Sequence, residues 1–170
     1  MKSIVILISF ICYLFSSCTI EDNTPKSAGL QIGDALPLFS ISNNYGEIVS
    51  HHSCIGKVSL IVFINTECSD CRKALPAIQK VYDLFSENND CLFAVIARGE
   101  DEEKARSWLE TQGYTFPTFS DNNAEIYSLF AISGIPRIYL SGKRSYISTI
   151  QVENVNEERL IRNITYLLNK

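Results

Sequence analysis

Two cysteines separated by two residues are the feature of this sequence best suited to chemistry. Cys68 and Cys71 enclose Ser69-Asp70 and directly follow an apolar run of strand length. A cysteine that begins a helix faces unpaired N–H groups and the positive end of the helix dipole, which lower the pKa of a thiol. A residue three positions later is about one turn on, so its thiol stays within bonding reach. The pair predicts dithiol–disulfide exchange, in which Cys68 attacks a disulfide and Cys71 resolves the mixed disulfide.

The same spacing also suits a structural disulfide or half of a zinc site. A zinc site needs two further ligands, and the closest candidates are His51, His52 and Cys54. Adjacent histidines do not have metal-site spacing, so we interpret them as loop residues and expect neither a metal nor another cofactor. Cys91 opens an apolar run, and we interpret it as a core residue.

The segments around the pair have the pattern of an α/β fold. Residues 58–64 form a continuous apolar run rich in β-branched side chains, typical of a strand buried on both faces. Helical spacing follows the pair as far as Phe85, with Ser69 or Asp70 as the expected N-cap and a kink expected at Pro76. The other expected strands are 38–41, 47–49, 91–97, 137–140 and 146–152, and the other expected helices are 101–112, 126–132 and 156–168. This order predicts a central mixed β-sheet flanked by helices, with an N-terminal β-hairpin.

The amino-terminal residues have the pattern of an export signal. Lys2 is followed by a predominantly apolar run of twelve residues, 4–15, too short for a stable membrane helix, and then by Ser16-Ser17 and Cys18. Small residues before a cysteine resemble the lipobox of bacterial lipoproteins, which implies lipidation of Cys18. Phe15 differs from the Leu that is usual in that motif. The alternative is ordinary secretory cleavage near Ser17 that leaves Cys18 as a free thiol.

The chain therefore divides into three parts. Residues 1–17 are predicted to be a lipoprotein signal peptide, residues 18–32 a flexible polar tether, and residues 33–170 one domain. The formal net charge is −4, with no basic run that would indicate nucleic-acid binding.

Three motifs of the domain resemble the TlpA/ResA-type thioredoxin-like proteins. Residues 62–76, with the two cysteines and the proline five residues after the second, look like the active-site segment of that family. Gly134-Ile135-Pro136 resembles its cis-proline loop, and residues 33–39 resemble the start of its N-terminal hairpin. The likeness extends in order over residues 33–170 and implies a thioredoxin-like fold.

The resemblance also implies roles for the proline loop and for partners. A cis bond at Pro136 would hold the loop beside the cysteines, and the backbone of Ile135 would pair with a peptide substrate. The alternative is an ordinary turn proline, since trans is the default for X–Pro bonds. The implied partners are disulfide-containing exported proteins and an upstream thiol electron donor. The protein is expected to be a monomer in the bacterial cell envelope, anchored to the membrane by lipid at Cys18 and facing the periplasm or the cell surface.

The site departs from the family pattern at three places. Glu67 occupies a position where Trp is common, Ser69-Asp70 replaces more usual residues, and Val62 stands where thioredoxin has a buried Asp. Asp70 places negative charge near the developing thiolate, which predicts a potential toward the reducing end of the thioredoxin-like range. Glu67 is a candidate proton acceptor for Cys71, or alternatively a solvated residue at the rim of the site.

Two other functions fit parts of the sequence. A peroxiredoxin shares the fold but needs Pro-x-x-x-Thr-x-x-Cys, where this chain has Ile61 and Asn65. A non-enzymatic lipoprotein would use the cysteine pair to bind a metal or a partner. Residues 98–101 would either line the mouth of the site or form the turn into the next helix, and the turn is the favoured interpretation.

Overall fold

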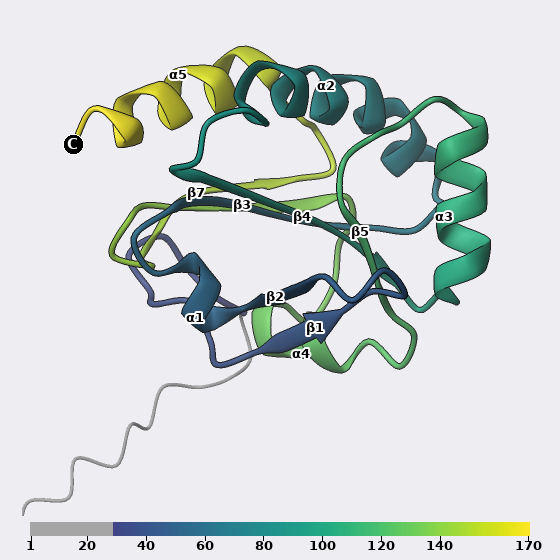
Figure 1. Ribbon diagram of the computed structural model, residues 1–170. Helices are drawn as coiled ribbons and strands as arrows, with labels where there is room; N and C mark the ends of the chain where they lie inside the picture. Colours follow the sequence, from purple (N-terminus) through teal and green to yellow (C-terminus); the bar gives the residue numbers. More distant parts are fainter. Residues whose placement is uncertain (1–28) are drawn as a thin grey trace, which may run out of the picture.

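The computed structural model describes residues 29–170, and its centre is a five-stranded mixed sheet with helices on both faces (Figure 1). The predicted signal peptide, the predicted lipidation site Cys18 and most of the predicted tether lie outside the described residues. The central mixed sheet, the flanking helices and the N-terminal hairpin confirm the predicted fold class. No helix within residues 29–170 combines the length and the apolar character needed to cross a membrane.

The elements follow one another in a strand–helix order that agrees closely with the sequence pattern. They are β1 (Ser40–Ser42), β2 (Ile48–Ser50), α1 (His51–Cys54), β3 (Val58–Ile64), α2 (Ser69–Phe85), β4 (Cys91–Arg98), α3 (Glu102–Thr111), β5 (Thr118–Asp121), α4 (Glu125–Phe130), β6 (Arg137–Ser141), β7 (Ile147–Val152) and α5 (Glu157–Leu168). Two predictions were wrong or incomplete. His51 and His52 lie in the short helix α1 rather than in a loop, and the edge strand β5 was not predicted.

The strand order places the ends of two central strands together. The sheet order is β5-β4-β3-β6-β7, in which β3 is parallel to β4 and antiparallel to β6. Phe63 near the end of β3 pairs with Arg137 at the start of β6. The segment after β3, which contains Cys68, and the segment before β6, which contains Pro136, therefore meet at one end of the sheet.

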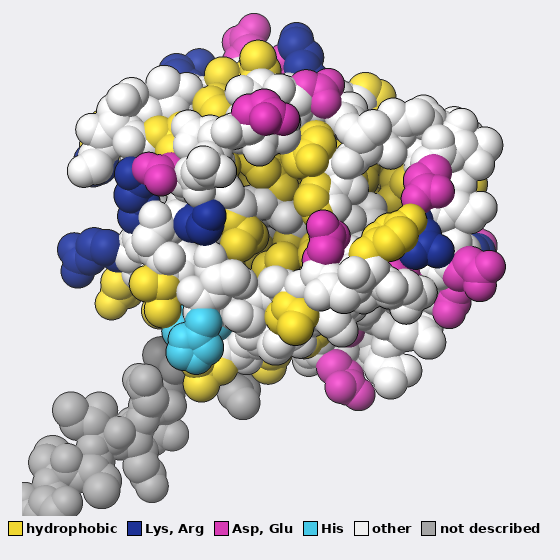
Figure 2. Space-filling view, in the orientation of Figure 1, with side chains coloured by type: hydrophobic (Ala, Val, Ile, Leu, Met, Phe, Trp, Pro, Cys, Tyr) yellow, Lys and Arg dark blue, Asp and Glu magenta, His cyan; other side chains and the backbone are white. Residues whose placement is uncertain are grey.

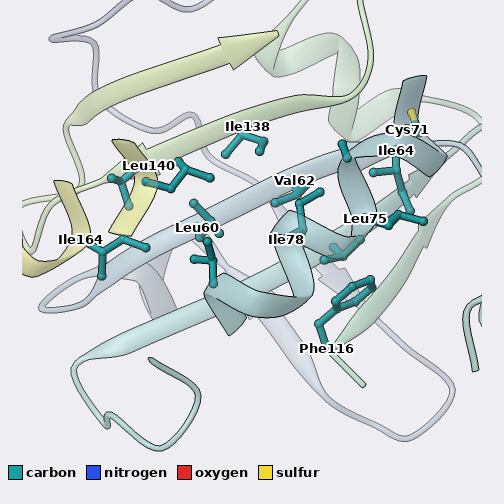
Figure 3. Close-up of a cluster of buried hydrophobic side chains, with 14 of the residues drawn as sticks. Leu60, Val62, Ile64, Cys71, Leu75, Ile78, Phe116, Ile138, Leu140 and Ile164 are labelled. Carbon is teal, nitrogen blue, oxygen red and sulfur yellow. The ribbon is translucent and has the colours of Figure 1, made fainter. Parts of the chain in front are cut away.

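Strand β3 is the centre of the core because every one of its residues is buried. Successive side chains of a strand point to opposite faces of the sheet. Leu60, Val62 and Ile64 pack with α2, α5 and Phe116 on one face (Figure 3). Ile61 and Phe63 pack on the other face with residues of β1, β2 and α4. A continuous apolar run is therefore required at β3, as the sequence indicated.

The hairpin β1–β2 covers the face of the sheet opposite α2 and α5. Ile41 pairs with Val49 across the hairpin, and both are buried. Helix α1 follows β2 directly, with Ser50 as its N-cap, and ends at the fully buried Cys54. The hairpin thus closes the second apolar layer.

Candidate active site

Cys68 itself is the N-cap of α2. Its backbone is extended, and its Sγ accepts a hydrogen bond from the N–H of Cys71 at 3.3 Å. The predicted caps Ser69 and Asp70 are the first two residues of the helix instead, so that prediction was wrong by one or two positions. The correction strengthens the chemical argument, because an N-cap side chain faces the unpaired N–H groups of the first turn.

Cys71 lies on the buried side of the same turn. Its exposed fraction is 0%, whereas Cys68 is half-buried, and both are free thiols. Burial raises the pKa of the Cys71 thiol, and the hydrogen bond with the Cys68 side chain raises it further. The two thiols are therefore in contact but unequal: Cys68 is reachable from solvent, and Cys71 is held protonated behind it.

The proline loop lies against the exposed thiol. The Ile135–Pro136 peptide bond is cis, as the resemblance implied, and the Cys68 thiol lies 3.8 Å from the carbonyl oxygen of Ile135. Pro136 is buried and Ile135 is half-buried. The structure thus brings together four predicted site residues, Cys68, Cys71, Ile135 and Pro136.

Side chains from two elements hold the proline loop in place. The carbonyl oxygen of Gly134 accepts hydrogen bonds from the Tyr127 hydroxyl at 3.0 Å and from Arg137 Nε at 3.3 Å. A second Arg137 nitrogen donates to the carbonyl of Ser133 at 2.6 Å. The loop is fixed by α4 and β6, so its position beside Cys68 does not depend on a bound substrate.

Glu100 is a site residue that the sequence analysis missed. It is only 4% exposed, and its carboxylate accepts the backbone N–H of Thr66 at 2.6 Å and the Thr66 hydroxyl at 2.5 Å. The Nε atom of Arg72 donates to the Thr66 carbonyl at 2.5 Å from the other side. Thr66 therefore has all its polar groups bound, which fixes the turn that leads into Cys68. The favoured interpretation of residues 98–101 as a plain turn was incomplete.

The two other charged residues beside the cysteines lie at the surface. Glu67 accepts a hydrogen bond from Lys104 Nζ at 2.6 Å, and this interaction lowers the pKa of the Glu67 carboxyl. Asp70 pairs with Lys73 at 2.9 Å. Part of the negative charge that Asp70 brings to the helix start is thus balanced, although Asp70 still helps to raise the pKa of Cys71.

The described residues do not form a metal centre at the cysteine pair. Within residues 29–170, no three His, Cys, Asp or Glu side chains are grouped so that they could hold a metal ion. His51 and His52 contact each other edge to face on α1, and Cys54 on the same helix is buried.

Comparisons with known proteins agree with this geometry. The model of the AhpC/TSA family matches residues 32–150. The chain belongs to this family. It is 26% identical over 136 residues to the thioredoxin-like protein YneN of Bacillus subtilis, covering 79% of each chain. It is 23% identical over 164 residues to the thiol-disulfide oxidoreductase ResA of Bacillus thuringiensis subsp. konkukian, covering 95% of this chain and 94% of that one.

A solved structure of another protein has the same fold. The solution structure of a proposed protein disulfide isomerase from Bacteroides thetaiotaomicron matches with a TM-score of 0.78 at 30% identity. The match covers 85% of this chain and 95% of that one. Its family, its relatives and its fold together identify the protein as a thioredoxin-like thiol–disulfide oxidoreductase.

Proposed function

We propose that the protein reduces disulfides in exported proteins through Cys68 and Cys71. The thiolate of Cys68 attacks one sulfur of the client disulfide, a mixed disulfide forms, and the other client sulfur leaves as a thiolate that takes up a proton. Cys71 then loses its proton and attacks Cys68, which releases the second client thiol and leaves a Cys68–Cys71 disulfide. An upstream dithiol donor returns two electrons and two protons to the pair.

This proposal rests on one observation: two thiols are in contact at the start of one helix, and one of them is exposed while the other is buried. The exposed thiol is the one that a client can reach, and the buried thiol is protonated until a mixed disulfide forms beside it. The backbone of Ile135, with its carbonyl 3.8 Å from Cys68 Sγ, is placed to pair with an extended client segment.

Trapping tests the assigned roles. Reduced Cys71→Ala protein incubated with a disulfide-containing protein such as insulin should accumulate a one-to-one adduct that dithiothreitol releases. The matched Cys68→Ala variant should form no adduct, although its second thiol is intact. If both variants trapped the client equally, or neither did, the assignment of Cys68 as attacking thiol would be wrong.

The proposed location is the bacterial cell envelope, where disulfides persist in exported proteins. The signal pattern of residues 1–17 and the cysteine that follows support lipid anchoring at Cys18, facing the periplasm or the cell surface, with the domain acting as a monomer. Metabolic labelling with a radioactive fatty acid should mark the wild-type protein and leave a Cys18→Ala variant unlabelled. Labelling of both would place the lipid elsewhere.

We also infer a role for Glu67 as the acceptor of the proton that Cys71 loses. Its contact with Lys104 keeps it ionised and able to accept a proton, while the lowered pKa makes it a weak base. A Glu67→Gln variant should then show a slower release step with a changed pH profile. Unchanged exchange rates across the pH range would reduce Glu67 to a solvated residue at the rim.

A peroxiredoxin activity is the second candidate because the family model includes AhpC in its name. The Pro and Thr that such a site requires are absent from the positions seven and three residues before Cys68. Ile61 is fully buried in β3, and the side-chain amide of Asn65 donates a hydrogen bond to the carbonyl of Arg98. Peroxide consumption should therefore stay at the background rate. Consumption that depends on Cys68 would overturn this conclusion.

A further inference from the structure

Four basic side chains gather at the end of the sheet opposite the cysteine pair. This surface, the basic end, consists of Lys57, Lys143, Arg144 and Lys170. Strand β6 begins next to the proline loop and ends at Ser141, two residues before Lys143 and Arg144. The carbonyl of Lys143 accepts the N–H of Gly56 at 2.8 Å, which brings the residue before Lys57 to the same place. Figure 2 shows Lys and Arg side chains gathered on one flank of the domain.

The basic end contains a concavity of about 500 Å³ with apolar and cationic walls. Gly33, Gly142, Lys143, Arg144, Tyr146, Leu167 and Lys170 are among the residues that line it. The absence of side chains at the two glycines leaves room near the cations. A phosphate group with its ester chains has the matching chemistry, because it joins an anion to an apolar tail.

Two of the four cations lie over exposed tyrosine rings. The Arg144 guanidinium is 5.7 Å from the centre of the Tyr146 ring, and Lys170 Nζ is 4.5 Å from that of Tyr166. Both tyrosines are more than half exposed. Tyrosine is enriched at the level of lipid headgroups because its ring is apolar and its hydroxyl is polar. Arg144 and Lys170 have no ion pair among residues 29–170, whereas Lys143 pairs with Asp90 at 2.8 Å.

The net charge of the whole chain favours one orientation of the domain on an anionic layer. The protein has a net charge of −4, so most of its surface is repelled by an anionic layer and the basic end is attracted. The chain passes this end soon after its described start, since Leu30 donates its N–H to Phe130 at the end of α4 and Gly33 lines the concavity and donates its N–H to Ile147 at 2.8 Å. Cys18 precedes Gly29 by only eleven residues, so a lipid on Cys18 would hold the domain within about 40 Å of the membrane.

We propose that the basic end docks on an anionic phospholipid surface and that its concavity receives the lipid phosphate groups. Docking in this orientation turns Cys68, at the opposite end of the sheet, toward the aqueous compartment and its clients. The inference depends on the proposed export and anchoring for the presence of a membrane, and it does not depend on the thiol chemistry.

Vesicle binding tests the proposal with the full chain carrying Cys18→Ser, which cannot be lipidated there. Vesicles of equimolar phosphatidylglycerol and phosphatidylcholine should sediment several-fold more protein than vesicles of phosphatidylcholine alone. The apolar residues 4–15 contribute equally to binding of both kinds of vesicle, so their contribution cancels when the two amounts of bound protein are compared. Each basic residue near an anionic surface strengthens binding by about five-fold, so Arg144→Glu/Lys170→Glu should weaken binding to the anionic vesicles by at least about thirty-fold.

A matched double variant controls for net charge. Arg159→Glu/Arg162→Glu makes the same change in charge at exposed positions of α5 away from the concavity, and it should retain most of the binding. Equal losses in both double variants, or equal binding to both kinds of vesicle, would overturn the proposal. Competition by a DNA duplex as effective as that by anionic vesicles would identify a general polyanion surface and would also overturn it.

The thiol chemistry serves as an independent readout. Insulin reduction in solution should be the same for the wild type and for Arg144→Glu/Lys170→Glu, because both positions lie at the far end of the sheet. Lost vesicle binding with full reductase activity is the expected result. Normal vesicle binding in a protein without reductase activity would contradict the proposed function and leave the docking surface standing.

Discussion

The two ends of the central strands contain the same residue type in different surroundings. Cys68 and Cys71 follow the carboxyl end of β3, while Cys54 and Cys91 lie next to the amino ends of β3 and β4. Burial raises the pKa of Cys54 and raises that of Cys91 to about 11. Only at the carboxyl end does a thiol cap a helix and face a proline loop. Its position at a helix start, rather than the presence of a thiol, is what distinguishes Cys68 as the proposed attacking thiol.

The largest expected effect comes from removing one cysteine from each end of the sheet and comparing the losses of activity. Cys68→Ala should lower the rate of insulin reduction by more than about a thousand-fold, the scale of removing an enzyme's nucleophile. Cys91→Ala removes a thiol from the other end and should leave the rate within about two-fold, since it removes no group from the reaction. Turbidity of precipitating insulin chains measures both rates. A large loss in Cys91→Ala, with the fold intact by circular dichroism, would contradict the division between the two ends.

Alkylation sharpens the comparison within the pair itself. In the reduced protein near pH 8, iodoacetamide should modify Cys68 at least about a hundred-fold faster than Cys71, because each unit of raised pKa cuts the thiolate fraction ten-fold. Mass spectrometry of digested samples gives the rate at each site. In urea, where burial is lost, the two rates should converge. Equal rates in the folded protein would mean that Cys71 is not shielded.

The next largest effect is expected at Glu100, the buried carboxylate that binds Thr66 in the turn before Cys68. Glu100→Gln replaces one acceptor oxygen with an NH2 group, so either the N–H or the hydroxyl hydrogen of Thr66 loses its acceptor. A buried unsatisfied group costs about 1–3 kcal/mol in the free energy of unfolding, measurable by urea denaturation. The exposed neighbour Glu103 provides the control, and Glu103→Gln should change stability much less. A Glu100→Gln protein as stable as the wild type would show that the buried contact contributes nothing net.

Residues near each other in sequence were predicted better than contacts between distant segments. Strand β3 was predicted at its observed bounds because a run of seven residues that are all apolar except Ser59 leaves little choice. The cysteine pair and Pro136 were found because their spacing and neighbours have a recognisable pattern. Glu100 lies 34 residues from Thr66, and nothing in the local sequence marks a carboxylate that will be buried against a distant turn. Strand β5 was missed because four residues of mixed polarity at a sheet edge carry little periodic signal.

The cap of α2 shows why a local pattern can be right in kind and wrong in position. Ser and Asp are among the preferred N-cap residues, so Ser69 and Asp70 were reasonable candidates from propensity. The structure gives that position to Cys68, whose Sγ accepts the N–H of Cys71. Propensity ranks residue types by their average behaviour, whereas here the strand end and the proline loop fix where the helix begins. A functional residue has taken a place that a better cap former would usually occupy.

The smallest expected effect is that of Cys91 on the free energy of unfolding at alkaline pH. The folded pKa of Cys91 is above its unfolded value, so its contribution to stability is fully present below the unfolded pKa and is lost as pH rises through the folded pKa, about 11. Between about pH 8 and pH 10 the wild type should lose about 1 kcal/mol more than Cys91→Ala, a figure reduced for the half-exposed position. Urea unfolding of both reduced proteins at the two pH values measures the difference. A thiol that ionised freely in the folded state would produce no difference, and Cys91 would then resemble Cys68 more closely than its burial indicates.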